Sequence, residues 1–224
     1  AIGELPPTNG NERYARWLKT NIREQRQPGY VTATVALPLG DLTADQLRSL
    51  ADIVREFTNG TIRTTVEQNF VIRWVSKADV PDLFADLDAV GLGEPGASNI
   101  LDIVACPGTD TCKLGISSSR GLAAELRTRL AQKSMQMDQA IQDLHIKISG
   151  CFNSCGQHHI ANIGFHGAVM KGPGGQVPAY ELFLAGDSSG EQIRVGHRIK
   201  ARIPAKKAAV AILIGFLLPP VNHH

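Results

Sequence analysis

The sequence has almost no excess charge of either sign. It carries 23 Lys and Arg residues against 21 Asp and Glu residues, so its formal net charge is only +2. Chains that bind nucleic acid through its phosphate backbone usually carry a clear basic excess. At the level of the whole chain, the sequence therefore predicts no nucleic-acid partner.

Long hydrophobic runs and a leader segment are missing as well. The longest apolar run, Ala208 to Leu218, is shorter than the roughly 20 residues that cross a bilayer, and Gly215 interrupts it. The first residues do not join a basic segment to an apolar one, as a secretion signal does. We therefore expect no membrane partner and a reducing, cytoplasmic setting. With 43% hydrophobic residues over 224 positions, the chain can build two compact units.

Cysteine is scarce, and its positions are the main functional signal. All four cysteines lie in two short segments, Ala105 to Lys113 and Gly150 to Gly156. The first pair has the spacing C-x5-C and the second pair the spacing C-x3-C. If the four thiolates serve one buried centre, two loops that are remote in the sequence must meet in the fold.

Disulfides, a structural zinc ion and inert packing are the alternatives to a cluster for these cysteines. Two disulfides are typical of short secreted chains that lack a large core. A structural zinc site usually spaces its paired ligands C-x2-C to C-x4-C, so the second pair would suit zinc and the first would not. Inert core cysteines are not expected to gather in two loops flanked by glycine and proline. An iron-sulfur cluster fits better, because it needs four soft thiolates and small residues, here Gly108, Gly150 and Gly156, for close backbone approach.

The first part of the chain predicts a ferredoxin-like α+β unit. Residues 1–28 are expected to form a linker and a short helix over 11–27, and residues 29–98 a half-domain. Thr43 and Gln46 form a capping-box signature at the start of a helix. The expected elements are a strand at 30–39, a helix from Thr43 to Asn59-Gly60, strands at 61–65 and 70–75, and a helix at 80–90. This βαββα order is typical of ferredoxin-like folds.

The second part, residues 99–224, predicts strands that bracket the cysteine loops. A segment rich in Gly, Pro and Ser, Leu92 to Asn99, separates it from the first unit. The expected elements are a helix at 120–133, a strand at 145–148, and strands at 161–169 and 179–185 joined by a turn at 172–175. The strand at 145–148 would lead into the second cysteine loop.

At its cysteines the sequence resembles the sirohaem-containing nitrite and sulfite reductases. The two cysteine spacings match those of the family, and three further segments look like family segments in the same order: Pro38 to Thr43, Arg63 to Asn69 and Cys106 to Cys112. The resemblance covers roughly residues 10–205 and is to the C-terminal half of these enzymes. It implies an α+β fold, in which a ferredoxin-like half-domain is followed by a nitrite/sulfite reductase [4Fe-4S]/sirohaem-binding domain.

The resemblance also implies a role for each cysteine. A [4Fe-4S] cluster would be bound by Cys106, Cys112, Cys151 and Cys155, and Cys155 would also bind the sirohaem iron. One sulfur would then couple the two redox centres. The implied activity is the six-electron reduction of sulfite to sulfide or of nitrite to ammonia. Protein side chains alone supply neither the electrons nor the ligand field for this chemistry.

Further candidate residues lie near these motifs. Asn153, Arg63 and Gln68 lie in segments that resemble cofactor-facing parts of the family, so they are candidate sirohaem contacts. A purely conformational role for Asn153 and a structural role for Arg63 stay open. His158 and His159 are haem or metal ligands by residue type, but with cysteine as the axial ligand we expect ordinary polar packing.

The implied partners are ferredoxin or a similar electron donor, and sulfite or nitrite as substrate. Members of the family have two related halves, and the substrate-binding Arg and Lys residues come mostly from the other half. We therefore expect a missing N-terminal half, or a second copy of the chain, to complete the active site, and we assign no catalytic residue. The alternative function is a non-catalytic module that carries a cluster for electron transfer, or zinc for structure, without sirohaem.

Overall fold

The computed structural model describes residues 4–133, 137–188 and 192–217. The chain divides into two compact units, residues 1–102 and residues 103–224, and each unit has its own sheet. Within the described ranges, no helix is both long and apolar enough to cross a membrane.

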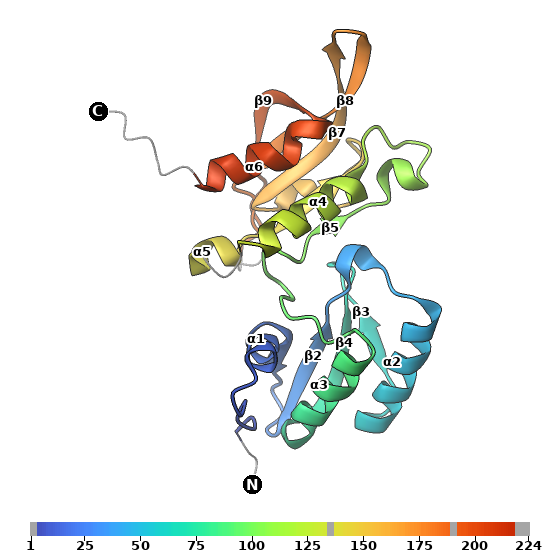
Figure 1. Ribbon diagram of the computed structural model, residues 1–224, viewed down its shortest axis with the longest axis vertical. Helices are drawn as coiled ribbons and strands as arrows, with labels where there is room; N and C mark the ends of the chain where they lie inside the picture. The colour runs from blue at the N-terminus through green and yellow to red at the C-terminus, as the bar shows by residue number, and fades with distance from the viewer. Residues whose placement is uncertain (1–3, 134–136, 189–191, 218–224) are drawn as a thin grey trace, which may run out of the picture. The chain divides into compact units, whose positions relative to one another are not determined.

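The first unit packs helices against a four-stranded antiparallel sheet of order β1-β2-β4-β3 (Figure 1). Its elements are α1 (Glu12–Asn21), β1 (Ile22–Glu24), β2 (Tyr30–Val35), α2 (Ala44–Phe57), β3 (Ile62–Thr64), β4 (Phe70–Ser76) and α3 (Val80–Ala89). Helices α2 and α3 contact each other, and α2 also contacts β4. The predicted ferredoxin-like order βαββα is present as β2-α2-β3-β4-α3.

Local sequence signals explain the start of α2. The Thr43 hydroxyl accepts a hydrogen bond from the Gln46 backbone N–H at 3.1 Å, and the Gln46 side chain accepts one from the Thr43 N–H at 3.0 Å. This reciprocal pair satisfies two N–H groups that have no partner inside the helix. The predicted capping box is confirmed.

The prediction of one helix over residues 11–27 is wrong. Helix α1 ends at Asn21, and Ile22 begins strand β1, which pairs with β2 through Ile22 and Ala33. The buried Asn21 side chain donates to the backbone oxygens of Thr34 at 2.7 Å and Glu94 at 3.0 Å. Ile22 fits the helical spacing, but pairing with a strand further along the chain overrides that local preference.

The second unit has a five-stranded sheet of order β5-β6-β7-β8-β9, with helices α4 and α6 packed together beside it (Figure 1). Its elements are β5 (Val104–Ala105), α4 (Ser119–Ala131), α5 (Gln139–Gln142), β6 (Ile146–Ser149), β7 (Ile163–Gly172), β8 (Gly175–Leu184), β9 (His197–Pro204) and α6 (Ala208–Leu217). Strands β5, β6 and β7 are parallel, and β8 and β9 continue the sheet antiparallel. The predicted turn at 172–175 closes the β7-β8 hairpin.

Strand β9 is absent from the sequence prediction. It lies at the edge of the sheet, and all its residues from His197 to Arg202 are exposed. Its basic residues do alternate with Ile199, Ala201 and Ile203, which is a strand pattern that the sequence prediction overlooked. The polar stretch around residues 134–143 also contains the short helix α5, and residues 134–136 lie outside the described residues.

Candidate metal centre

The two cysteine loops leave the second sheet at one edge. Cys106 directly follows β5, and Gly150-Cys151 directly follows β6, which pairs with β5 in parallel. The carboxyl ends of adjacent parallel strands lie side by side, so loops that follow them start close together. The Cys106 N–H donates to the Ile148 carbonyl at 3.1 Å, which joins the first cysteine to the second strand. The fold therefore brings the two remote segments together.

Backbone hydrogen bonds hold the first cysteine loop against the second. The N–H groups of Ile116 and Ser117 both donate to the Gly150 carbonyl, at 2.8 and 3.0 Å. In return, the Gly150 N–H donates to the sulfur of Cys106 at 3.1 Å. Backbone N–H groups that point at cysteine sulfurs are one of the means by which a protein tunes a bound iron-sulfur cluster.

Glycines make this approach possible. A Cβ atom on Gly150 would lie 2.5 Å from Cα of Gly108, and one on Gly115 would lie 2.6 Å from the carbonyl carbon of Gly108. A Cβ on Gly167 would collide with the Gly150 carbonyl, and one on Gly156 with the Ile148 carbonyl. A side chain at Gly150 would push the two loops apart, and one at Gly115, Gly156 or Gly167 would collide with neighbouring backbone.

The four thiols differ in exposure. Cys106 and Cys151 are buried, Cys112 and Cys155 are exposed, and none forms a disulfide. Among the described residues, no three His, Cys, Asp or Glu side chains gather closely enough to hold a single metal ion.

These observations fit a cluster better than a single ion. A single zinc ion needs its ligands about 2.0–2.3 Å from one point. A [4Fe-4S] cluster instead takes its cysteines at separate iron atoms. Four free thiols on two interlocked loops, with an N–H group directed at one sulfur, are therefore a donor set that suits a cluster.

Side chains fix the shape of the second cysteine loop. The Ser149 hydroxyl accepts a hydrogen bond from the Gly156 N–H at 3.1 Å and lies 2.9 Å from Nδ1 of His158. The Ser154 hydroxyl lies 3.0 Å from Nδ1 of His159. Ser154 itself has a left-handed backbone, with φ of 61°. The loop between Cys151 and Gly156 is thus held by the strand before it and by the turn after it.

His158 is the most buried titratable group beside this loop. Its side chain is fully buried, and its ring packs against His159 and Phe183 with centroids 4.0 and 4.9 Å apart. Burial, followed by the neighbouring His159 and His166, lowers the pKa of His158 to about 3. Within the described residues, its Nε2 atom has no hydrogen-bond partner. A neutral, packed His158 agrees with the polar packing that we expected.

Sequence reasoning missed Ser149 and Ser154. Their hydroxyls bond to backbone and imidazole groups that only the fold brings near. The one signal available was their position, directly before Gly150 and directly before Cys155, where a small hydroxyl residue can serve the loop backbone.

The remaining candidate residues lie in separate places. Asn153 is exposed in the second cysteine loop. Arg63 is exposed on the edge strand β3 of the first unit, and Gln68 follows it in the tight turn before β4, with φ of 65°. Contacts of these three residues with a cofactor stay predictions. Asn69 has a structural role, because its side chain accepts from the Leu37 N–H at 2.8 Å.

Comparison with known proteins agrees with both units. Residues 23–90 match the family model of the nitrite/sulfite reductase ferredoxin-like half domain, and residues 96–216 match that of the nitrite and sulphite reductase 4Fe-4S domain. The chain is 33% identical over 172 residues to a "Sulfite reductase [ferredoxin]" of Mycobacterium tuberculosis, an alignment that covers 74% of this chain and 30% of the relative. It is 28% identical over 165 residues to a "Ferredoxin--nitrite reductase" of Synechococcus elongatus, covering 74% of this chain and 31% of the relative.

Solved structures show the same fold. The Mycobacterium tuberculosis NirA protein superposes with a TM-score of 0.73 at 27% identity, over 86% of this chain and 36% of that chain. A dissimilatory sulfite reductase I matches with a TM-score of 0.60 at 10% identity, over 78% of this chain and 58% of that chain, and supports the fold alone. The chain spans about a third of the length of the two curated relatives, 30% and 31%. The predicted resemblance and fold class are confirmed, and the chain belongs to the nitrite and sulfite reductase family.

Proposed function

We propose that this chain provides the cluster-bearing half of a sirohaem-dependent reductase, which reduces sulfite to sulfide or nitrite to ammonia. The observation that carries the proposal is the meeting of the two cysteine loops at the ends of β5 and β6. The names of the relatives add weight, since they include both a sulfite reductase and a nitrite reductase.

The cysteines would hold the cofactors. Cys106, Cys112 and Cys151 would bind a [4Fe-4S] cluster, and Cys155 would bind both the cluster and the sirohaem iron. When bound, these groups supply one-electron storage and an iron that can take up a small oxyanion. Cys155 is exposed, as a thiol that serves a second group must be, and Cys112 shares this property, so the choice of Cys155 rests on the family resemblance.

The chain's own residues would tune and protect the centre. The Gly150 N–H, directed at the Cys106 sulfur, stabilises added negative charge and so raises the tendency of the cluster to accept an electron. The burial of Cys106 and Cys151 keeps water from two of the four ligands. The hydrogen bonds of Ser149 and Ser154 hold Cys155 in a fixed loop, which limits reorganisation around the shared sulfur.

Two partners complete the proposal. A ferredoxin or a similar one-electron carrier would supply electrons, as the names of the relatives suggest for those proteins. A second, related half or a second copy of this chain would add the basic side chains that bind the anionic substrate. The choice between sulfite and nitrite would depend on those side chains. Arg63, Gln68 and Asn153 are proposed as further sirohaem contacts.

Visible absorption tests the proposal. The chain is reconstituted without oxygen with iron, sulfide and sirohaem, alongside Cys155→Ser and Cys106→Ser. We expect haem-like bands and a broad cluster shoulder in the unchanged chain. Cys155→Ser should lose the sirohaem bands and weaken the cluster shoulder, and Cys106→Ser should weaken the shoulder. A colourless protein that retains one zinc ion would refute the proposal and favour the non-catalytic module.

A further inference from the structure

Polar side chains cross the second sheet in one row. The strand register places Ser149 of β6 opposite His166 of β7. On the next strands Glu181 of β8 pairs with His166, and Arg202 of β9 pairs with Glu181. Residues that face each other on neighbouring strands point to the same side of a sheet. These four side chains, which we call the polar row, therefore share one face of the sheet.

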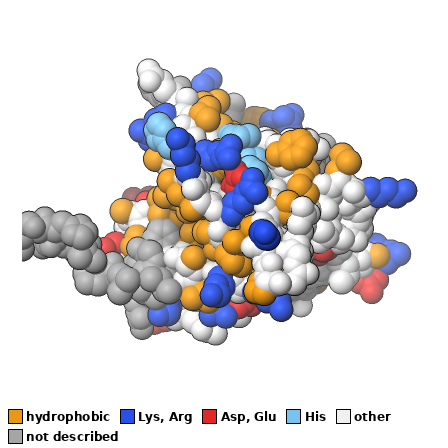
Figure 2. Space-filling view, turned by 90° about the horizontal axis from the view of Figure 1, so that it is seen from above, with side chains coloured by type: hydrophobic (Ala, Val, Ile, Leu, Met, Phe, Trp, Pro, Cys, Tyr) orange, Lys and Arg blue, Asp and Glu red, His pale blue; other side chains and the backbone are white. Residues whose placement is uncertain are grey.

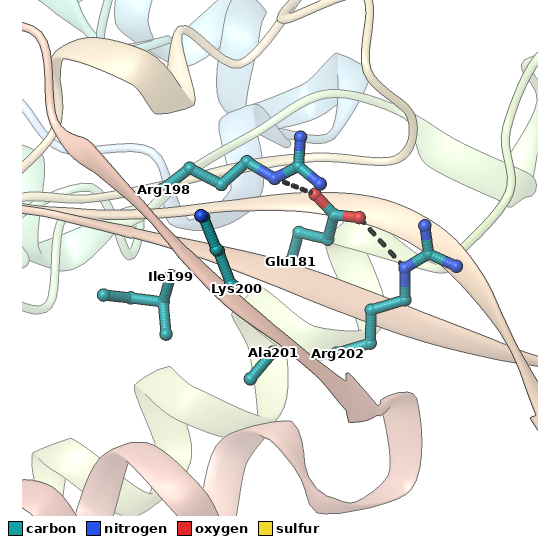
Figure 3. A pocket seen from close by; sticks show the side chains of 6 residues that line it. All are labelled: Glu181, Arg198, Ile199, Lys200, Ala201 and Arg202. Carbon is teal, nitrogen blue, oxygen red and sulfur yellow. Dashed lines mark hydrogen bonds and ion pairs between the residues drawn. The ribbon is translucent and has the colours of Figure 1, made fainter.

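Glu181 is the buried anion of the polar row. It is only 4% exposed, and it binds Nε of Arg198 at 2.7 Å and Nε of Arg202 at 3.0 Å (Figure 3). A hollow of about 420 Å³ lies beside it, lined by Glu181, Arg198, Ile199, Lys200, Ala201 and Arg202. Figure 2 shows Lys, Arg and His side chains gathered around a small acidic spot on one face of the molecule. Water in the hollow therefore reaches the edge of this carboxylate.

His166 directs a nitrogen atom that can take a proton at the same carboxylate. Its Nδ1 atom lies 3.1 Å from the Gly167 carbonyl. A carbonyl oxygen only accepts hydrogen bonds, so Nδ1 carries the proton of the neutral ring. The Nε2 atom then has a lone pair, and it lies 3.5 Å from the Glu181 carboxylate. A second proton on the ring would therefore be placed between Nε2 and a buried anion.

Opposing charges meet at the His166 ring. Among the described residues, the charged and titratable groups that face it from the elements packed against it are Glu181 of β8, Arg198 and Arg202 of β9, Lys147 of β6, and His158 and His159 of the turn that follows the cysteine loop. Glu181 favours the protonated ring, and the cations oppose it. His158 stays neutral, because burial lowers the pKa of His158 to about 3. A further negative charge nearby would shift this balance toward the protonated ring.

The second cysteine loop lies close to this ring. Ser149, the register partner of His166, comes two residues before Cys151. Adjacent strands are about 4.8 Å apart and two residues span at most about 7 Å, so the Cα atoms of His166 and Cys151 lie within roughly 12 Å. At that distance, and at an effective dielectric constant of about 20, one unit charge changes the equilibrium of another about tenfold. A charge added at the loop is therefore felt at His166.

We propose that His166 takes up a proton when a cluster held by the cysteine loops takes up an electron. The proposal rests on the function proposed above, which supplies the cluster and its one-electron donor. In this step the donor loses one electron and the cluster gains it. A hydronium ion in the hollow loses one proton, which passes by Glu181 and forms an N–H bond at Nε2 of His166. The new cation offsets part of the new negative charge.

The coupling acts equally in both directions. The reduced chain binds the proton about tenfold more tightly than the oxidised chain, and the protonated chain accepts the electron more readily by the same factor. Reduction of sulfite or nitrite consumes protons as well as electrons. His166 would therefore help the cluster to accept electrons under the conditions in which protons are available.

The pH dependence of the cluster potential tests the proposal. The chain is reconstituted with iron and sulfide, and its midpoint potential is measured with mediators at pH 5.5 and pH 8.5. We expect the equilibrium constant for reduction to be about tenfold larger at the lower pH, which is about 59 mV. His166→Gln should lower this difference below about threefold, because glutamine takes up no proton.

His197→Gln is the matched control. His197 is exposed on β9 and pairs with Leu184, whose side chain points to the other face of the sheet from Glu181. This variant should keep the tenfold difference. If the difference stays tenfold in His166→Gln, or is lost equally in both variants, the coupling is overturned. A polar row with a merely structural role predicts the first of these results, together with lower stability of His166→Gln.

Nuclear magnetic resonance of the cofactor-free chain gives a second reading, which does not require His166→Gln to fold. The assigned ring signals of His166 should change between pH 5 and pH 8, where histidine side chains exchange their proton. Signals that stay constant over this range would overturn the coupling. Iron analysis separates this failure from that of the proposed function: a chain that takes up no cluster would refute that function and the coupling together, whereas a loaded cluster with an unchanged pH dependence would refute the coupling alone.

Discussion

Ser149 links β6 to the second cysteine loop, and its replacement by alanine is a sharp test of that link. The hydroxyl is the acceptor for the Gly156 N–H and the neighbour of His158 Nδ1, at 3.1 and 2.9 Å. Ser149 is 1% exposed, so water cannot replace the lost group without a rearrangement. Ser149→Ala therefore leaves two buried polar groups without partners.

The expected cost follows from these two groups. Each buried donor or acceptor that loses its partner costs about 1–3 kcal/mol. His158 is fully buried, so its Nδ1 atom cannot bond to water once the Ser149 hydroxyl is removed. Its Nε2 atom has no partner among the described residues even in the unchanged chain. We expect Ser149→Ala to lower the free energy of unfolding by about 2–5 kcal/mol.

Urea unfolding of the chain without cofactors measures this loss, with circular dichroism as the signal. Thr128→Ala is the matched control, because its exposed hydroxyl bonds within helix α4, to the Ala124 carbonyl at 2.9 Å. The control should change stability by no more than about 0.5 kcal/mol. A loss below about 1 kcal/mol in Ser149→Ala would refute the reasoning, since it would mean that the loop is not held by this hydroxyl.

Two further changes probe the same region. Gly150→Ala places a Cβ atom 2.5 Å from Cα of Gly108, so the two cysteine loops must separate. We expect the free energy of unfolding to fall by about 1–3 kcal/mol and iron uptake to decrease. Full iron uptake would contradict the close packing of the loops. His158 has a pKa lowered to about 3, so its contribution is complete above the unfolded pKa of about 6.5 and is lost as the pH falls below it. At pH 5 this loss is about 2 kcal/mol. His158→Gln should remove this part of the acid sensitivity in urea unfolding at pH 7.5 and pH 5. An unchanged difference would show that the fold does not lower the pKa of His158.

Signals that depend on neighbouring residues predicted the fold well. The capping box of Thr43 and Gln46 and the glycine-rich turn at 172–175 are complete within a few residues, so the sequence contains all that determines them. The cysteine spacings work in the same way, because two short motifs define the proposed ligand set. These features account for the ferredoxin-like order and the adjacent cysteine loops.

Features that depend on distant partners were not predictable in this way. Strand β1 exists because Ile22 meets Ala33, and no local pattern separates it from the end of a helix. Strand β9 is different, because Arg198 to Ile203 alternates between basic and apolar residues and was overlooked although the pattern is local. The ion pairs of Arg198 and Arg202 depend on the buried Glu181 of strand β8 and on a register shift between β8 and β9.

Iron and sulfide content tests the central claim most directly. The chain is reconstituted without oxygen, freed of unbound metal, and analysed beside Cys151→Ser. We predict about four iron and four acid-labile sulfide per chain, with a cluster signal in the electron paramagnetic resonance of the reduced protein. Cys151→Ser should lose most of both. A single zinc or iron ion without sulfide, bound equally well by Cys151→Ser, would contradict a cluster held by the two cysteine loops.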